Sequence, residues 1–115
     1  MAARTKALQT AKRQVDKAIH TPRTDIYETD EAVVVVADLP GVAVEDLDVT
    51  VENDRLRISG VLGEDVPRTG EFERKFALSD RLDGEAIDAE FRNGVVAVTV
   101  PKVQEARARK IAIKS

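Results

Sequence analysis

The stretch from Ala89 to Pro101 constrains the fold more than any other part of this 115-residue chain. At its centre, Asn93-Gly94 predicts a two-residue hairpin loop, because such a loop needs positive φ at both positions and Asn and Gly adopt it at least cost. Apolar and charged residues alternate before the loop. After it, a β-branched run ends at Pro101, which cannot donate to a ladder. The stretch therefore predicts a half-buried β-hairpin.

Short β-type segments separated by turn residues precede this hairpin. They are Asp25 to Glu28, Ala32 to Asp38, a strand with Leu47, Val49 and Val51, a return strand with Leu56 and Ile58 that runs to Gly60, and Gly70 to Ala77. No helical segment is available to cross between parallel strands. The pattern predicts an all-β fold, an antiparallel immunoglobulin-like sandwich of six or seven strands. The segment Ala32 to Asp38 is apolar on both faces, so we expect both of its faces to be covered.

The segment from Met1 to His20 predicts a short helical N-terminal arm. Its apolar residues, among them Leu8, Val15 and Ile19, recur every three or four positions, and Pro22 ends the pattern. A helix of ~20 residues is marginal alone, so we expect it to fold against a partner surface. Five basic and one acidic residue give the first 22 residues a charge of +4, which leaves −7 for the rest of a chain of net charge −3. The arm can dock on an acidic surface or contact anionic partners, or it can be a solvated helix face.

The last segment combines a charged stretch with an apolar end. Residues 102–110 show no periodicity and indicate a solvated tether. Ile111 and Ile113 project to the same side of an extended strand, which favours docking of the tail. The alternative is that Lys110 to Ile113 forms the last strand of its own sandwich. The sequence thus divides into an arm (1–22), a sandwich (23–101) and a tether with its tail (102–115).

Several functions lack the residues that they require. The chain has no Cys, and its one histidine, His20, lies in the arm, so thiolate or zinc sites and a Ser-His pairing within the sandwich are not predicted. No glycine-rich phosphate loop and no aromatic platform for bases is present. We therefore predict no enzyme activity, no cofactor and no nucleic-acid partner. No apolar run reaches the ~20 residues of a membrane span, and no secretory h-region is visible, so we expect a cytoplasmic protein with no membrane partner.

The hairpin resembles the signature hairpin of the small heat-shock proteins, the α-crystallin family. That signature is an Ala, three variable residues, Asn-Gly-Val and an aliphatic residue, and its places are filled by Ala89, Asn93, Gly94, Val95 and Val96. The resemblance extends from Thr24 to Ile113. It includes the opening strand Asp25-Ile-Tyr-Glu-Thr-Asp30, the turn Ala37-Asp38-Leu39-Pro40-Gly41-Val42, the central strand Gly70 to Leu78 with Phe72, Arg74 and Phe76, and the tail Ile111-Ala-Ile113.

The resemblance implies an ATP-independent holdase that captures unfolding client proteins and assembles as a homo-oligomer built from dimers. It implies that Ile111 and Ile113 are the oligomerisation tail and that Arg74 forms ion pairs across the dimer interface. The arm, with its apolar stripe Leu8, Val15 and Ile19, would bind clients. We expect the tail to dock in a groove lined by Leu47, Val49, Val51, Ile87, Ala89 and Phe91.

One departure and one alternative remain. Bacterial and plant members of the family carry a longer loop where this chain has Val61 to Thr69, and that loop holds a strand exchanged with the partner subunit. The short segment predicts little or no strand exchange. The alternative function is a non-chaperone interaction module, similar to the p23-type co-chaperones, that binds one folded partner.

Overall fold

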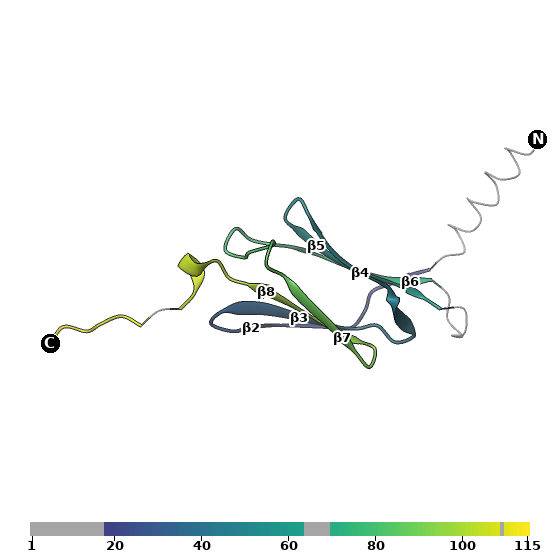
Figure 1. Ribbon diagram of the computed structural model, residues 1–115, viewed down its shortest axis with the longest axis horizontal. Coiled ribbons are helices and arrows are strands. Elements are labelled where there is room, and N and C mark those ends of the chain that lie inside the picture. Colours follow the sequence, from purple (N-terminus) through teal and green to yellow (C-terminus); the bar gives the residue numbers. More distant parts are fainter. Residues whose placement is uncertain (1–17, 64–69, 109) are drawn as a thin grey trace, which may run out of the picture.

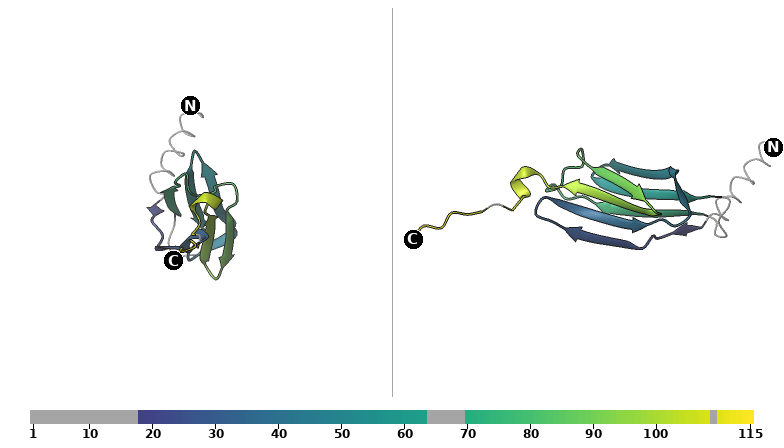
Figure 2. Two further views of the ribbon diagram at one scale, coloured as in Figure 1. Left: turned by 90° about the vertical axis from the view of Figure 1, so that its left-hand side faces the viewer. Right: turned by 60° about the horizontal axis from the view of Figure 1, so that its bottom comes forward.

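Two four-stranded sheets stack face to face in the computed structural model, which describes residues 18–63, 70–108 and 110–115 (Figure 1). The first sheet has the spatial order β1 (Ile19–His20), β6 (Glu71–Ala77), β5 (Arg55–Leu62) and β4 (Val42–Glu52). The second sheet has the order β2 (Thr24–Glu28), β3 (Ala32–Asp38), β8 (Val95–Pro101) and β7 (Asp88–Arg92). The two layers are seen edge-on in Figure 2. The predicted all-β sandwich is confirmed.

The predicted Asn93-Gly94 turn and a second tight turn, at Asn53-Asp54, form with the backbone that their residues favour. Asn93 and Gly94 have φ of 53° and 78°, and Asn53 and Asp54 have φ of 52° and 59°. Positive φ at both central positions matches the right-handed twist of the flanking strands. The Gly94 carbonyl also accepts a hydrogen bond of 2.6 Å from the Leu39 amide, so the signature hairpin is fixed to the turn that follows β3.

The core lies between the inward faces of the two sheets. In the second sheet, Val35 and Ala37 of β3 pair with Val98 and Val96 of β8, and all four are buried. Aliphatic residues form most of this core, whose buried members are Val35, Ala37, Leu39, Val42, Leu56, Ile58, Phe72, Val96, Val98 and Val100. On the outward face of β3, Val34 is also buried, whereas Val36 is half-buried. The expectation that β3 is covered on both faces is thus met at Val34 and only in part at Val36.

The N-terminal segment enters the first sheet as a strand. Ile19 and His20 pair in parallel with Glu71 and Phe72 of β6, so the prediction that the helix continues to His20 is wrong. The Glu71 amide donates to the Ala18 carbonyl at 2.9 Å. A Cβ atom on Gly70 would lie 2.0 Å from the same carbonyl oxygen, so this approach of the backbone requires glycine. Residues 1–17 of the predicted helix lie outside the described residues.

Candidate functional site: an exposed tail and an apolar sandwich edge

The residues predicted to line a docking groove lie on two edge strands. Leu47, Val49 and Val51 of β4 pair with Gly60, Ile58 and Leu56 of β5. The side chains of Ile58 and Leu56 are fully buried in the core. In β7, Ala89 and Phe91 pair with the buried Val98 and Val96, and Ile87 directly precedes the strand. The inward faces of both edge strands therefore carry these residues, as the alternation of the sequence predicted.

These two edges lie on the same side of the sandwich. β4 ends the first sheet and β7 ends the second. Gly84, in the segment that leads to β7, lies so close to β4 that an added Cβ would be 3.4 Å from Val51 Cγ1. Leu47, Val49, Ile87 and Phe91 pack on the core and are only partly buried, while Ala89 and Val51 are exposed. We call this set of six residues the apolar edge.

The C-terminal tail runs away from the sandwich. Residues 110–115 belong to neither sheet, and in Figure 1 this yellow segment extends clear of the strands. Ile111 and Ile113 are 75% and 93% exposed. Water therefore surrounds two large aliphatic side chains, and burial of either one against another apolar surface would be favourable.

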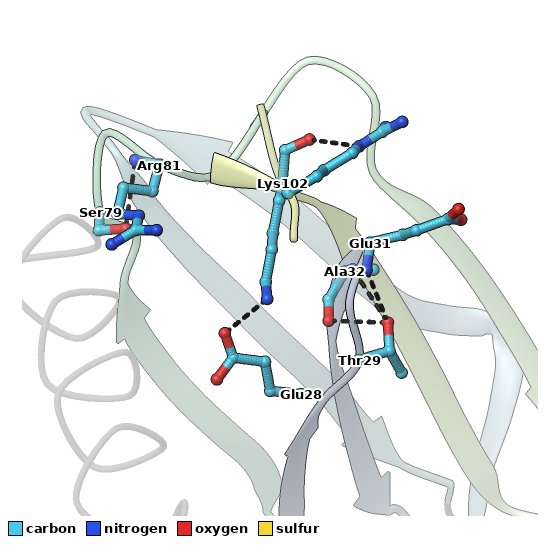
Figure 3. A network of polar contacts seen from close by, with 8 residues as sticks. Glu28, Thr29, Glu31, Ala32, Ser79, Arg81 and Lys102 are labelled. Atoms are coloured by element: carbon cyan, nitrogen blue, oxygen red, sulfur yellow. Dashed lines mark hydrogen bonds and ion pairs between the residues drawn. The ribbon is translucent and has the colours of Figure 1, made fainter. Parts of the chain in front are cut away.

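The root of the tail, in contrast, is held firmly against the sandwich (Figure 3). The Lys102 amide donates to the Glu31 carbonyl, and the Val103 amide donates to the Arg81 carbonyl, both at 2.8 Å. The Lys102 side chain is only 13% exposed and its Nζ lies 2.7 Å from Glu28 Oε1, at the end of β2. A short 3-10 helix, η1 (Gln104–Ala106), follows. The tether is therefore anchored at its start and extended only beyond this helix.

Two glutamates have lowered pKa values because cationic side chains donate to them. The hydrogen bond from Lys102 to Glu28, together with the attraction between their charges, lowers the pKa of Glu28 from its ordinary value of 4.5. On the outward face of the first sheet, Arg57 donates to Glu73 from Nε at 3.1 Å and from Nη2 at 2.8 Å. This hydrogen bonding lowers the pKa of Glu73 below 4.5. We did not predict either pair, since their members lie far apart in the sequence.

Arg74, predicted to lie at a dimer interface, is on the inward face of β6. It shares this face with Phe72 and Phe76 and pairs with Ile58 of β5. Its guanidinium carbon lies 5.2 Å from the centre of the Phe76 ring, a cation–π distance. The side chain is half-buried, and within the described part of the chain it makes no ion pair.

The residues predicted to bind clients are described only in part. Leu8 and Val15 lie outside the described residues. Ile19 is 65% exposed in β1. Its neighbour across the strand pair is Glu71, and the next residue in the same row is Val61 of β5, which is 44% exposed. Glu71 therefore lies between two exposed apolar side chains, one at the end of the arm and one on the first sheet.

The described residues offer surfaces for binding and no cluster suited to a metal. Among residues 18–63, 70–108 and 110–115, no group of three or more His, Asp or Glu side chains could hold a metal ion. No helix in this part of the chain is long and apolar enough to cross a membrane. The same residues do offer apolar contact, through an extended tail and an apolar edge.

A two-sheet sandwich with this strand order and an Ile-X-Ile tail is an α-crystallin domain. The closely similar structures include heat shock protein 16.0 from Schizosaccharomyces pombe, with a TM-score of 0.69 and 32% identity over 84% of this chain and 78% of that one. A small heat-shock protein from Xylella fastidiosa has a TM-score of 0.70 and 31% identity over 85% of this chain and all of that one.

The sequence comparisons lead to the same family. The profile described as "Hsp20/alpha crystallin family" matches residues 25–114. A probable 15 kDa heat shock protein of Leptospira interrogans is 38% identical over 84% of this chain and 81% of its own length. A 17.8 kDa class I heat shock protein of Arabidopsis thaliana is 42% identical over 85% of this chain and 69% of its own length. The chain belongs to the Hsp20/alpha crystallin family of small heat shock proteins.

Family membership confirms two predictions from the sequence, the family itself and the absence of enzyme activity. Members of the family are non-enzymatic, are typically chaperones, and are generally oligomers that bind client proteins.

Proposed function

We propose that this chain is an ATP-independent holdase of the cytoplasm. It binds unfolding proteins through exposed apolar surfaces and delays their aggregation. Capture of this kind uses hydrophobic contact and requires no cofactor, nucleotide hydrolysis, nucleic acid or membrane. Its partners are unfolding clients and further copies of the same chain.

The exposure of the tail isoleucines carries this proposal. Ile113 is 93% exposed while the apolar edge keeps partly buried aliphatic and aromatic side chains at the surface. A tail and an edge of complementary chemistry in one chain fit an assembly in which each tail occupies a neighbour's edge. When a tail leaves, it uncovers apolar surface that a client can occupy.

The anchored root of the tail favours a neighbour over the tail's own sandwich. Lys102 and Val103 are fixed by backbone hydrogen bonds, and η1 follows them directly. The tail therefore starts from a defined point and reaches outward (Figure 2). We propose that Ile111 and Ile113 dock on the apolar edge formed by Leu47, Val49, Val51, Ile87, Ala89 and Phe91 of another copy.

Two further surfaces complete the proposed assembly. The half-buried Arg74 would form its ion pairs with a second subunit, which makes β6 part of a dimer interface. The arm, through Leu8, Val15 and Ile19, would contact clients or neighbouring subunits. The short connection from Val61 to Thr69 leaves little chain for an exchanged strand, so we propose a dimer with little or no strand exchange.

Light scattering of a heated client tests the function. Substoichiometric amounts of the protein should suppress scattering by a test enzyme that aggregates on heating, and added ATP should not change the suppression. If a molar excess leaves the scattering unchanged, the holdase proposal fails. In that case the alternative, an interaction module similar to the p23-type co-chaperones that binds one folded partner, takes its place.

A further inference from the structure

The outward face of the first sheet contains a hollow of about 340 Å³ that the proposed chaperone function does not use. It lies beside the tight turn between β4 and β5, on the side of the sheet that faces away from the core. Its lining combines three cationic side chains with polar groups, and comprises Thr50, Glu52, Asn53, Arg55, Arg57 and Lys75.

The strand register brings the cations together. Arg57 of β5 lies directly opposite Lys75 of β6 and opposite Thr50 of β4, so two like charges face each other across one strand pair. Such an arrangement is unfavourable unless a counter-charge is present. Glu73 provides part of it, since its carboxylate accepts from Arg57 and lies 3.7 Å from Lys75 Nζ.

The remaining positive charge is not neutralised by the described residues. Arg55 is on the same face, two residues before Arg57, and its side chain makes no ion pair within residues 18–63, 70–108 and 110–115. Glu52 faces it across the strand pair and is also without an ion pair there. The three cations around the hollow thus exceed the two nearby carboxylates, on a sandwich whose sequence is acidic overall.

Hydrogen bonds within the sandwich hold Arg57 and the turn beside the hollow in place before any ligand arrives. Arg57 donates hydrogen bonds from Nε and Nη2 to Glu73, and from Nη1 to Ser59 Oγ at 3.0 Å. One N–H on Nη1 and one on Nη2 therefore remain to bind a ligand. The Asn53-Asp54 turn is fixed by the hydrogen bond of 2.8 Å from the Leu78 amide to the Asp54 carbonyl. Strands and a tight turn position a site more rigidly than a loop does.

We propose that this hollow is a binding site for a short chain of phosphoryl groups, such as a triphosphate. Guanidinium groups match phosphate oxygens in geometry, an ammonium group adds a point charge, and the Thr50 hydroxyl and the Asn53 amide supply further donors. The volume lies at the lower end of the range for small-molecule sites, which fits a small polyanion. Inorganic triphosphate and the triphosphate of a nucleotide share this chemistry.

Thermal stabilisation of the full-length protein at low ionic strength measures this binding. A ligand that binds only the folded state raises the thermal midpoint as its concentration passes the Kd. Sodium tripolyphosphate and ATP are titrated separately. We expect a saturable rise with tripolyphosphate that added NaCl weakens. A similar rise with ATP shows that the site accepts a nucleoside beyond the triphosphate, and no rise with ATP shows that it takes only the free triphosphate.

Charge-matched variants locate the site. Arg55→Gln combined with Lys75→Gln removes two cations from the hollow and keeps the Arg57–Glu73 pair. We expect its affinity for tripolyphosphate to fall about tenfold or more, because hydrogen bonds to charged groups are individually worth this much. Arg92→Gln combined with Lys110→Gln changes the net charge equally at exposed positions elsewhere, and we expect wild-type affinity.

Two results would overturn the proposal. If the hollow variant binds as tightly as the control variant, the anion binds elsewhere, for example on the basic residues of the arm. If the wild-type midpoint does not rise with tripolyphosphate, the hollow is only a solvated face. Neither result depends on client protection, because the measurement is of ligand binding.

Discussion

Replacing both tail isoleucines by alanine should dissociate the oligomer into smaller species without unfolding the sandwich. Ile111 and Ile113 are 75% and 93% exposed in the isolated chain, so nearly all of each side chain is available for burial against a neighbour. Burial of each is worth about 1.5–3 kcal/mol, or about 3–6 kcal/mol for the pair. Association and ordering of the tether cost about 4 kcal/mol or more, so one tail alone gains about 2 kcal/mol at most and should bind with a Kd of about 30 mM or weaker.

Several tails in one closed assembly act together, because each bound tail raises the effective concentration of the next. The double substitution removes six buried carbons per tail, which is about 5 kcal/mol at about 0.8 kcal/mol each. That exceeds the net gain of docking, so Ile111→Ala with Ile113→Ala should produce smaller oligomers. Because neither side chain contributes to the core, the thermal midpoint should hardly change.

Multi-angle light scattering gives the oligomer mass, and circular dichroism gives the melting midpoint. Ala112→Ser is the matched control, since this residue lies between the isoleucines and points to the other side of an extended tail. It should leave the mass unchanged. A double variant of wild-type mass refutes the docking role. A large fall in its midpoint would mean that the tail is part of its own sandwich.

Three further predictions concern the arm, the dimer and the root of the tail. Deletion of residues 1–17, which keeps β1 and Ile19, should leave the thermal midpoint nearly unchanged and reduce oligomer mass or client protection; a deletion that fails to fold would show that the arm belongs to the core. Arg74→Ala should weaken dimerisation in sedimentation experiments, because loss of one partner of a desolvated ion pair costs about 2–5 kcal/mol, and an unchanged dimer would mean that this arginine acts within its own subunit. Lys102 lowers the pKa of Glu28 below 4.5, so their ion pair stabilises the fold above pH 4.5 and is lost as the pH falls through the lowered pKa. The melting midpoint of Glu28→Gln should therefore be below that of the wild type near neutral pH and equal to it in acid; equal midpoints near neutral pH would contradict the role of the pair.

Local features of the fold could be predicted from the sequence because their causes are local. The Asn93-Gly94 turn needs only a backbone that these two residues adopt readily, and the alternation in each strand directly assigns inward and outward faces. The six residues of the apolar edge were identified in this way. They remain partly or fully exposed because they lie on or beside edge strands, and the order of strands within each sheet decides which strands are edges.

Contacts between distant segments could not be predicted. Two residues, Ile19 and His20, leave the helical pattern because the β6 backbone offers them a parallel partner, and nothing within the arm itself indicates this. The same holds for the pair of Glu28 with Lys102, which depends on where β2 and β8 end. The hollow at Arg55 and Lys75 could not be predicted either, because it depends on the pairing register of three strands.

Disulfide formation between two populations of the protein tests tail docking most directly, since the natural chain contains no cysteine. One population carries Lys114→Cys in the tail, and the other carries Val51→Cys on the apolar edge. After subunit mixing and mild oxidation, we predict a cross-linked pair that contains one chain of each kind. The pair should disappear when the Lys114→Cys chain also carries Ile111→Ala and Ile113→Ala, and Glu90→Cys on the outward face of β7 should not form it. A cross-link that survives loss of both isoleucines, or one that forms equally well at Glu90, would contradict docking of the tail on a neighbour's edge.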